Sequence, residues 1–361
     1  MEHRTKQQRH QHRAPAARRA SDTRPAPAGR ATRRPWPLII GLGAAIVIAS
    51  LAALVLALRG PASAASEVAG SAGQPGGQVS VNGFSAVTDC RGFPAFTPEY
   101  GFRGGVIINT SLPERMGLVL LDPAQEGKGF QHPSWVKAGN LGPFTADEAG
   151  NIYVGPVPRV TLADNPPEGA NTIWRVDTKS AEMTPFLKLP AAAAPNERNP
   201  FGILGLAYDC DTSSIYASSV AGSGPASEVG RLFQIDPATK QVVSQVEGID
   251  ALGIIVANTP EGKRLYYGAA RESLIYSIAL DERGAFVGEP RLEIDLADLG
   301  GDVNEKARRI SLDGDTLKIT VVPFTFTLAA RSDDLQRHLA ARYDATLKAW
   351  VAADTPPTAA P

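Results

Sequence analysis

The chain has 361 residues, a formal net charge of −1 and 43% hydrophobic residues. This length suggests one large domain or two small ones, and 35 glycines with 29 prolines favour a turn-rich fold over a helix bundle. Two cysteines are too few for a disulfide-rich scaffold.

The charge is unevenly distributed along the chain. Residues 1–35 contain ten Lys/Arg and two acids, whereas the remainder contains 35 acids and 26 bases. The segment has almost no large apolar residue and cannot bury a core, so it is predicted to be a disordered basic tail. Its charges are expected to set membrane topology, with contact to anionic lipid headgroups as the alternative. No nucleic-acid partner is expected.

Residues 36–58 are predicted to form a transmembrane helix. Residues 38–58 are uncharged, and 21 helical residues span roughly 30 Å, the thickness of the hydrocarbon core. Basic residues on the N-terminal side place that end in the cytoplasm, which predicts a single-pass protein of the cell membrane with an extracytoplasmic C-terminal domain. A cleaved signal peptide with an A-x-A site at residues 62–64 is the alternative. The apolar run is, however, longer than the 7–15 residues typical of a signal, and Arg59 follows it.

Residues 59–80 have the Gly/Ala/Ser/Pro composition of a flexible stalk, residues 81–353 are assigned to one domain, and residues 354–361 to a disordered tail. The domain repeats one pattern every 45–60 residues. An apolar strand, a polar turn, a strand ending in Tyr, a loop, a strand of the type I-x-x-I-D, a turn and a closing strand follow in order. The predicted strands include 151–154, 172–177, 183–186, 206–209, 214–218, 230–236, 241–243, 254–257, 264–267, 273–278, 291–294, 309–312 and 316–319.

A four-strand unit with this period is typical of a propeller blade. Four copies are clear, and a degenerate copy covers residues 105–123. Together with the domain length, they predict an all-β, six-bladed β-propeller whose ring closes by pairing an N-terminal strand with the last blade. A β-sandwich is the alternative, but it would not repeat this order of turns and strands. Residues 324–328 are predicted to form a strand, and residues 333–342 a short helix or a loop.

The run Thr-Pro-Glu-Gly-Lys-Arg-Leu-Tyr at residues 259–266 and the run at 274–278 resemble the gluconolactonase and senescence-marker-protein family of six-bladed propellers. The run at 230–241 is similar to this family and to NHL propellers. The resemblance implies a propeller and, for the enzymes of the family, a divalent metal at one end of the channel. The equivalent ligand positions are Leu141, Leu252 and Lys306.

None of these three side chains is an oxygen donor of the kind that such a metal needs. We therefore expect no metal and no cofactor unless ligands have been relocated. Asp302, Asn304 and Glu305 lie close to the third position and are the candidate ligand-binding residues. No catalytic residue can be named from the sequence.

Cys90 and Cys210 both lie in the outer domain, where oxidation is allowed, and either pair in a disulfide or remain as buried thiols. The predicted function is binding of a small ligand or a protein at the channel mouth rather than catalysis. The alternatives are a gluconolactonase-like lactonase or esterase with relocated metal ligands, and a purely structural envelope component. An enzyme would require three or more acids or amides around the channel axis, whereas a binding module would require an apolar or aromatic mouth.

Overall fold

The computed structural model describes residues 67–68, 80, 82–103, 105–112, 115–159, 161–328 and 335–353. The predicted basic tail, transmembrane segment and C-terminal tail lie outside these ranges, as does most of the predicted stalk. Within them, no helix has both the length and the apolar character needed to span a bilayer.

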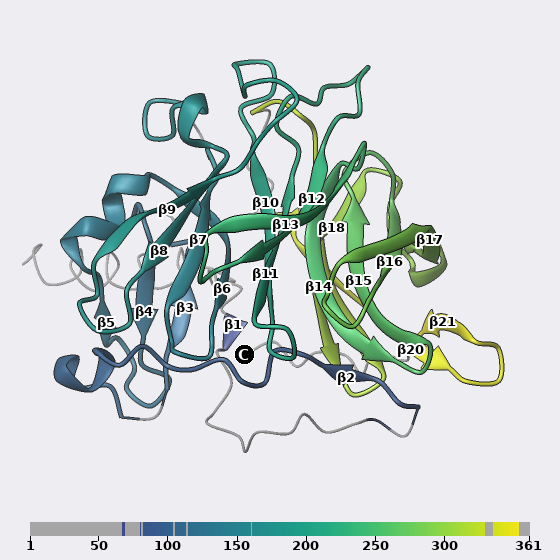
Figure 1. Ribbon diagram of the computed structural model, residues 1–361, viewed down its shortest axis with the longest axis horizontal. Coiled ribbons are helices and arrows are strands. Elements are labelled where there is room, and N and C mark those ends of the chain that lie inside the picture. Colours follow the sequence, from purple (N-terminus) through teal and green to yellow (C-terminus); the bar gives the residue numbers. More distant parts are fainter. Residues whose placement is uncertain are drawn as a thin grey trace, which may run out of the picture. The chain divides into compact units, whose positions relative to one another are not determined.

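Over the described ranges the strands form five antiparallel sheets, which follow one another along the chain (Figure 1). The first contains β1 (Glu67–Val68), β3 (Ile107–Asn109), β4 (Val119–Leu121) and β5 (Gly129–Phe130). The second contains β6 (Leu141–Ala146), β7 (Ile152–Pro156), β8 (Thr172–Val176) and β9 (Met183–Lys188). The third contains β10 (Ile203–Asp209), β11 (Ser214–Ser219), β12 (Arg231–Asp236) and β13 (Gln241–Glu247).

The fourth sheet contains β14 (Ala251–Thr259), β15 (Gly262–Ala269), β16 (Leu274–Leu280) and β17 (Phe286–Asp295), with β2 (Ser85–Ala86) added beside β14. The fifth contains β18 (Glu305–Asp313), β19 (Thr316–Pro323), β20 (Arg337–Asp344) and β21 (Ala349–Ala352). Four short 3-10 helices lie in the described loops: η1 (Thr97–Tyr100), η2 (Pro133–Ala138), η3 (Pro167–Gly169) and η4 (Leu296–Leu299).

This architecture is a β-propeller, and the prediction of six blades is wrong, because the described strands make five. The first strands of successive sheets contact each other: β6 with β10, β10 with β14, and β14 with β18. The four clear sequence copies and the degenerate one are the five blades. The sixth was inferred from the domain length, but residues 82–103 contribute no blade.

The tyrosine of the repeated motif explains how neighbouring blades pack. Tyr153, Tyr216 and Tyr266 lie on the second strands of three blades and are each at most 1% exposed. The Tyr216 hydroxyl donates to the carbonyl of Gly284 in the next blade, at 2.7 Å. Burial is the main reason that the pKa of all three phenols is raised. The repeated tyrosine therefore fills blade interfaces and is not a binding residue.

Two local predictions after β19 are wrong. Residues 324–328 alternate as a strand would, but they form a loop, because β19 and β20 pair only as far as Val321 and Arg337 and the residues beyond have no ladder partner. The segment predicted as a helix or loop contains β20 instead. Its buried residues Leu339 and Ala341 alternate with the more exposed His338, Ala340 and Arg342, which is the period of a half-buried strand.

An N-terminal segment, residues 82–96, crosses the ends of all five blades, and we call it the strap (Figure 1). The strap contacts the blades in reverse chain order. Asn82 Nδ2 donates to Asp315 Oδ2 in the fifth blade (2.8 Å), and β2 pairs with β14 in the fourth. The disulfide between Cys90 and Cys210 joins it to the third blade, with the Cα atoms 5.8 Å apart. Gly92 N then donates to Asp147 O in the second blade, and Phe96 packs into the core of the first two.

The prediction that an N-terminal strand closes the ring on the last blade is therefore wrong. The fifth blade consists of β18 to β21, all from the C-terminal part of the chain, and the strap supplies none of these four strands. Two residues of the predicted stalk, Glu67–Val68, form β1 and pair with β3 of the first blade.

Candidate functional site

The end of the channel at which β6, β10, β14 and β18 begin is closed by apolar side chains, and we call this end the mouth. It is the upper side of Figure 1, opposite the strap. The buried members of this cluster are Val157, Phe201, Val220, Leu252, Ala270 and Phe326, with Leu204, Phe324 and Leu328 packed against them. Phe324 and Phe326 come from the loop after β19 and lie 5.4 Å apart, centroid to centroid. Through this loop, Phe324 contacts Phe201 before β10 and Phe326 contacts Arg271 after β15, so the fifth blade packs against loops of the third and fourth.

The three positions equivalent to metal ligands all lie at this mouth. Leu141, Leu252 and Lys306 stand at or next to the first residue of β6, β14 and β18. The two leucines are at most 2% exposed and offer no donor atom. Across the described part of the chain, no group of three His, Cys, Asp or Glu could hold a metal ion. The positions are those that the resemblance implies, but two are apolar and the third is a lysine, so none supplies an oxygen ligand.

Lys306 is buried, and its ammonium is held by neutral oxygens. Its Nζ donates to the carbonyl of Val303 at 2.8 Å and to Ser273 Oγ at 3.3 Å. Burial lowers the pKa of Lys306, while the negative charges of Glu272 and Asp302 act in the opposite direction. This lysine ties the start of β18 to the loop before β16.

The three candidate residues named from the sequence, Asp302, Asn304 and Glu305, line one pocket of about 480 Å³. The structure adds residues that sequence reasoning missed. They come from the end of β19, the loop after it, and the start of β20: Pro323, Phe324, Thr325, Leu335 and Arg337. Arg337 and Leu335 were missed because this segment was expected to be a helix or loop, whereas β20 pairs with β19 and brings both residues beside β18.

A carboxylate–guanidinium contact crosses the pocket. Glu305 is 5% exposed; its Oε2 accepts from the backbone N–H of Asp302 at 2.7 Å, and its Oε1 lies 3.4 Å from Arg337 Nη1. Arg337 Nη2 also donates to the carbonyl of Gly300 at 2.7 Å. Asp302 is exposed, and its Oδ1 accepts from the backbone N–H of Asn304 at 2.9 Å. The pocket therefore has two carboxylates and one guanidinium that is already engaged.

A second ion pair stabilises the mouth from the fourth blade. The carboxylate of Asp250 is fully buried and lies 2.8 Å from both Nε and Nη2 of Arg271. Arg271 also donates to the carbonyls of Gly224 and Ser227 in the loop between β11 and β12. Its guanidinium carbon lies 5.0 Å from the ring centroid of Phe326. One side chain thus connects loops of the third, fourth and fifth blades.

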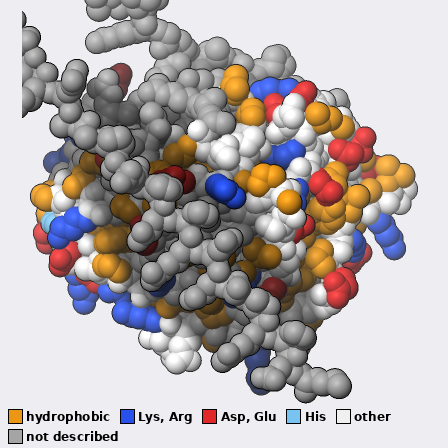
Figure 2. Space-filling model, turned by 90° about the horizontal axis from the view of Figure 1, so that it is seen from above, with side chains coloured by type: hydrophobic (Ala, Val, Ile, Leu, Met, Phe, Trp, Pro, Cys, Tyr) orange, Lys and Arg blue, Asp and Glu red, His pale blue; other side chains and the backbone are white. Residues whose placement is uncertain are grey.

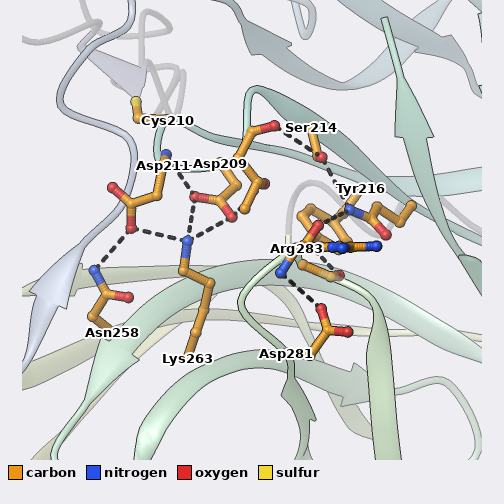
Figure 3. Close-up of polar contacts among 12 residues, drawn as sticks. Asp209, Cys210, Asp211, Ser214, Tyr216, Asn258, Lys263, Asp281 and Arg283 are labelled. Atoms are coloured by element: carbon orange, nitrogen blue, oxygen red, sulfur yellow. Dashed lines mark hydrogen bonds and ion pairs between the residues drawn. The ribbon is translucent and has the colours of Figure 1, made fainter. Parts of the chain in front are cut away.

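The polar cluster near the strap is structural (Figure 3). Lys263 Nζ donates to both oxygens of Asp209, at 2.9 and 2.8 Å, and lies 2.9 Å from Asp211 Oδ2. Asn258 Nδ2 donates to the same Asp211 oxygen at 3.1 Å. Asp209 also accepts from Thr212 Oγ1, so its buried charge is satisfied on several sides. This cluster joins the third and fourth blades beside the disulfide.

The two histidines of the described residues make local contacts. His132 Nδ1 accepts from the backbone N–H of Ser134 at the start of η2 and lies 2.7 Å from Ser134 Oγ, a buried hydroxyl that also accepts from Met183 N. His338 lies on β20 with its Nδ1 3.3 Å from Thr320 Oγ1. Ser218 donates to the carbonyl of Leu252.

Figure 2 shows the face seen from above in Figure 1, where hydrophobic side chains lie among basic and acidic ones in the coloured area.

No protein-family model matches the chain, and no curated protein matches it. Solved structures that are similar include an exo-beta-1,3-galactanase from Phanerochaete chrysosporium (10% identity, TM-score 0.41, covering 80% of this chain and 66% of that one). Another is the PQQ-bound aldose sugar dehydrogenase from Streptomyces coelicolor (16% identity, TM-score 0.37, covering 74% and 81%). A third is the Bacteroides ovatus xyloglucan PUL GH43B (13% identity, TM-score 0.31), where this chain covers 39% of the other. At these TM-scores the likeness carries no argument about activity, and the propeller assignment rests on the five sheets themselves.

Proposed function

We propose that this chain is a single-pass membrane protein whose extracytoplasmic five-bladed propeller binds a small ligand with an apolar group at the channel mouth. The observation that carries the proposal is the pocket of about 480 Å³ beside β18. Its volume is in the range of small-molecule sites, and such sites combine apolar walls with a few polar groups. Phe324, Leu335 and Pro323 supply the walls, and Glu305 and Arg337 supply the polar groups.

The anchoring part of the proposal rests on the uncharged run at residues 38–58 and the basic residues before it. The Cys90–Cys210 disulfide supports an oxidising location for the propeller. Protease added to intact cells is expected to degrade the propeller and to leave a tag at the N-terminus intact. Protection of the propeller in intact cells, with degradation only after lysis, would refute this topology.

Metal-dependent hydrolysis of lactones or esters, which the gluconolactonase resemblance implies, has no specific support at the mouth. Leu141 and Leu252 occupy two ligand positions, and Lys306 occupies the third. Asp302, Asn304 and Glu305 do lie near that third position, but they surround an apolar pocket with Arg337 among them. Two carboxylates, one of them already paired with Arg337, do not make the set of oxygen ligands that such a metal needs.

Binding can be tested with 4-phenylbutanol, a neutral probe with one aromatic ring, and the full chain in lipid nanodiscs. Saturation-transfer NMR is expected to show binding to the wild type and a loss of at least about fivefold with Leu335→Asp, because a charge in the apolar wall must be desolvated. The matched control is Leu347→Asp, since Leu347 is also exposed (65%, against 57% for Leu335) but lies in the turn between β20 and β21. Equal binding by wild type and Leu335→Asp would refute the proposed site.

A further inference from the structure

From the charges and rings around the pocket we infer that its ligand is an organic cation: an ammonium or guanidinium group attached to an apolar body. This inference rests on the proposed function and adds the chemical class of the ligand. Three features support it: the acids at the pocket outnumber the bases, Arg337 and Lys306 already have hydrogen-bond partners, and an aromatic ring lines the pocket.

The first feature is the charge inventory. The pocket is lined by the carboxylates of Asp302 and Glu305 and by one guanidinium, that of Arg337. Glu305 is paired with Arg337 across 3.4 Å, and the Asp302 carboxylate, which accepts from a backbone N–H, shares the charge of the nearby Lys306 ammonium with Glu272. Three carboxylates in and beside the pocket therefore face two cations, which leaves one negative charge to attract a cation. An anion would meet both carboxylates at close range.

The second feature is that the nearby cations are already satisfied. Arg337 donates to the carbonyl of Gly300 as well as contacting Glu305. Lys306 directs its ammonium to Val303 O and Ser273 Oγ. An anionic ligand would have to compete with these contacts, whereas a cation would take up the free capacity of Asp302.

The third feature is the aromatic wall. Phe324 lines the pocket, and its ring lies 5.4 Å from the rings of both Phe201 and Phe326. Phenyl faces attract ammonium and guanidinium groups, most strongly where water is excluded. The same mouth already contains such a contact, between Arg271 and Phe326. Leu335 and Pro323 complete a surface for the apolar part of the ligand.

The inference can be tested with three probes that share one apolar body and differ in charge: 4-phenylbutylamine, 4-phenylbutanol and 4-phenylbutyrate. Dissociation constants are measured for the full chain in zwitterionic nanodiscs at pH 7, at low and high salt. The amine is expected to bind about tenfold more tightly than the alcohol, and the butyrate more weakly than both. Raising the salt concentration should reduce the advantage of the amine.

Two variants locate the charge effect. Asp302→Asn keeps the oxygen that accepts from Asn304 but removes the charge, so the advantage of the amine over the alcohol should fall to about threefold or less. Asp298→Asn is the matched control, because Asp298 is an exposed acid of η4 that does not line the pocket. Arg337→Gln should strengthen amine binding, since it removes the competing cation.

The outcomes separate this inference from the proposed function. Binding of the alcohol and the amine with equal affinity, or tightest binding of the butyrate, would overturn the cation assignment and leave the pocket as a binding site. An amine advantage that Asp302→Asn and Asp298→Asn reduce equally would also overturn it. Failure of all three probes to bind would refute the proposed function itself.

Discussion

The disulfide that holds the strap to the third blade is expected to contribute strongly to the stability of the propeller. Cys90 and Cys210 are 120 residues apart in sequence, and the bond between them holds the strap against the third blade. Closing a loop of this length restricts the unfolded chain by about 5 kcal/mol in the chain-entropy model, and measured losses of native disulfides lie at about 2–5 kcal/mol. The double variant Cys90→Ala/Cys210→Ala is therefore expected to lower the free energy of unfolding by about 3–5 kcal/mol. Alanine is chosen because both cysteines pack against apolar residues, where a serine hydroxyl would need a partner.

The assay is urea unfolding of the full chain in detergent, followed by tryptophan fluorescence. Trp135, Trp174 and Trp350 lie in or beside the first, second and fifth blades, so they report on blades at both ends of the strap. Asn82→Ala provides a comparison at the other end of the strap. It removes the 2.8 Å bond to Asp315 and should cost about 0.5–1.5 kcal/mol. A loss below about 1 kcal/mol in the double cysteine variant would refute the reasoning, because it would mean that the hydrogen bonds of the strap suffice without the covalent link.

Three further outcomes concern the buried Asp209 ion pair, the packed mouth and the half-exposed Asp211. Lys263→Met leaves the buried Asp209 carboxylate without its cation and should lower the free energy of unfolding by about 3–5 kcal/mol. Asp211→Asn should lower it by less than about 1 kcal/mol, because the Asp211 carboxylate is half exposed. Equal losses for the two variants in urea unfolding would contradict this expectation. Phe326→Ala removes a ring that is 7% exposed and should lower the free energy of unfolding by about 3 kcal/mol. Thr325 is exposed, so Thr325→Ala should lower it by less than about 0.5 kcal/mol. Equal shifts of the melting temperature for the two variants would show that the mouth is not tightly packed. Burial acts to raise the pKa of Asp211, but hydrogen bonds from Lys263 and Asn258 outweigh it and hold the pKa below its ordinary value of 3.8. The stability from this group is therefore present above about pH 4 and lost as the pH falls through the lower pKa of the folded state, and Asp211→Asn should flatten that part of the acid unfolding curve.

The individual strands of this protein could be predicted from short-range patterns. Short apolar runs such as the one within 214–218, bounded by polar turn residues, are nearly all strands in the structure. The repeated order of turn, tyrosine strand and closing strand also indicated the blade correctly, because each blade is built from residues that are neighbours in sequence. The Asp302, Asn304 and Glu305 group was named because it lies close to the third ligand position that the gluconolactonase resemblance implies, and the structure places the three residues around one pocket.

The features that the sequence left undetermined all depend on contacts between distant residues. The number of blades is decided by how the sheets pack around one axis, because a domain covering residues 81–353 with a repeat of 45–60 residues fits five blades as well as six. The path of the strap depends on pairings such as Asn82 with Asp315, which are 233 residues apart. The pocket needs Arg337 and Phe324 beside Glu305, and only the pairing of β19 with β20 and β18 brings them together. Local alternation in sequence thus specifies strands and turns, whereas ring size and the binding pocket arise from side-chain packing that no short segment contains.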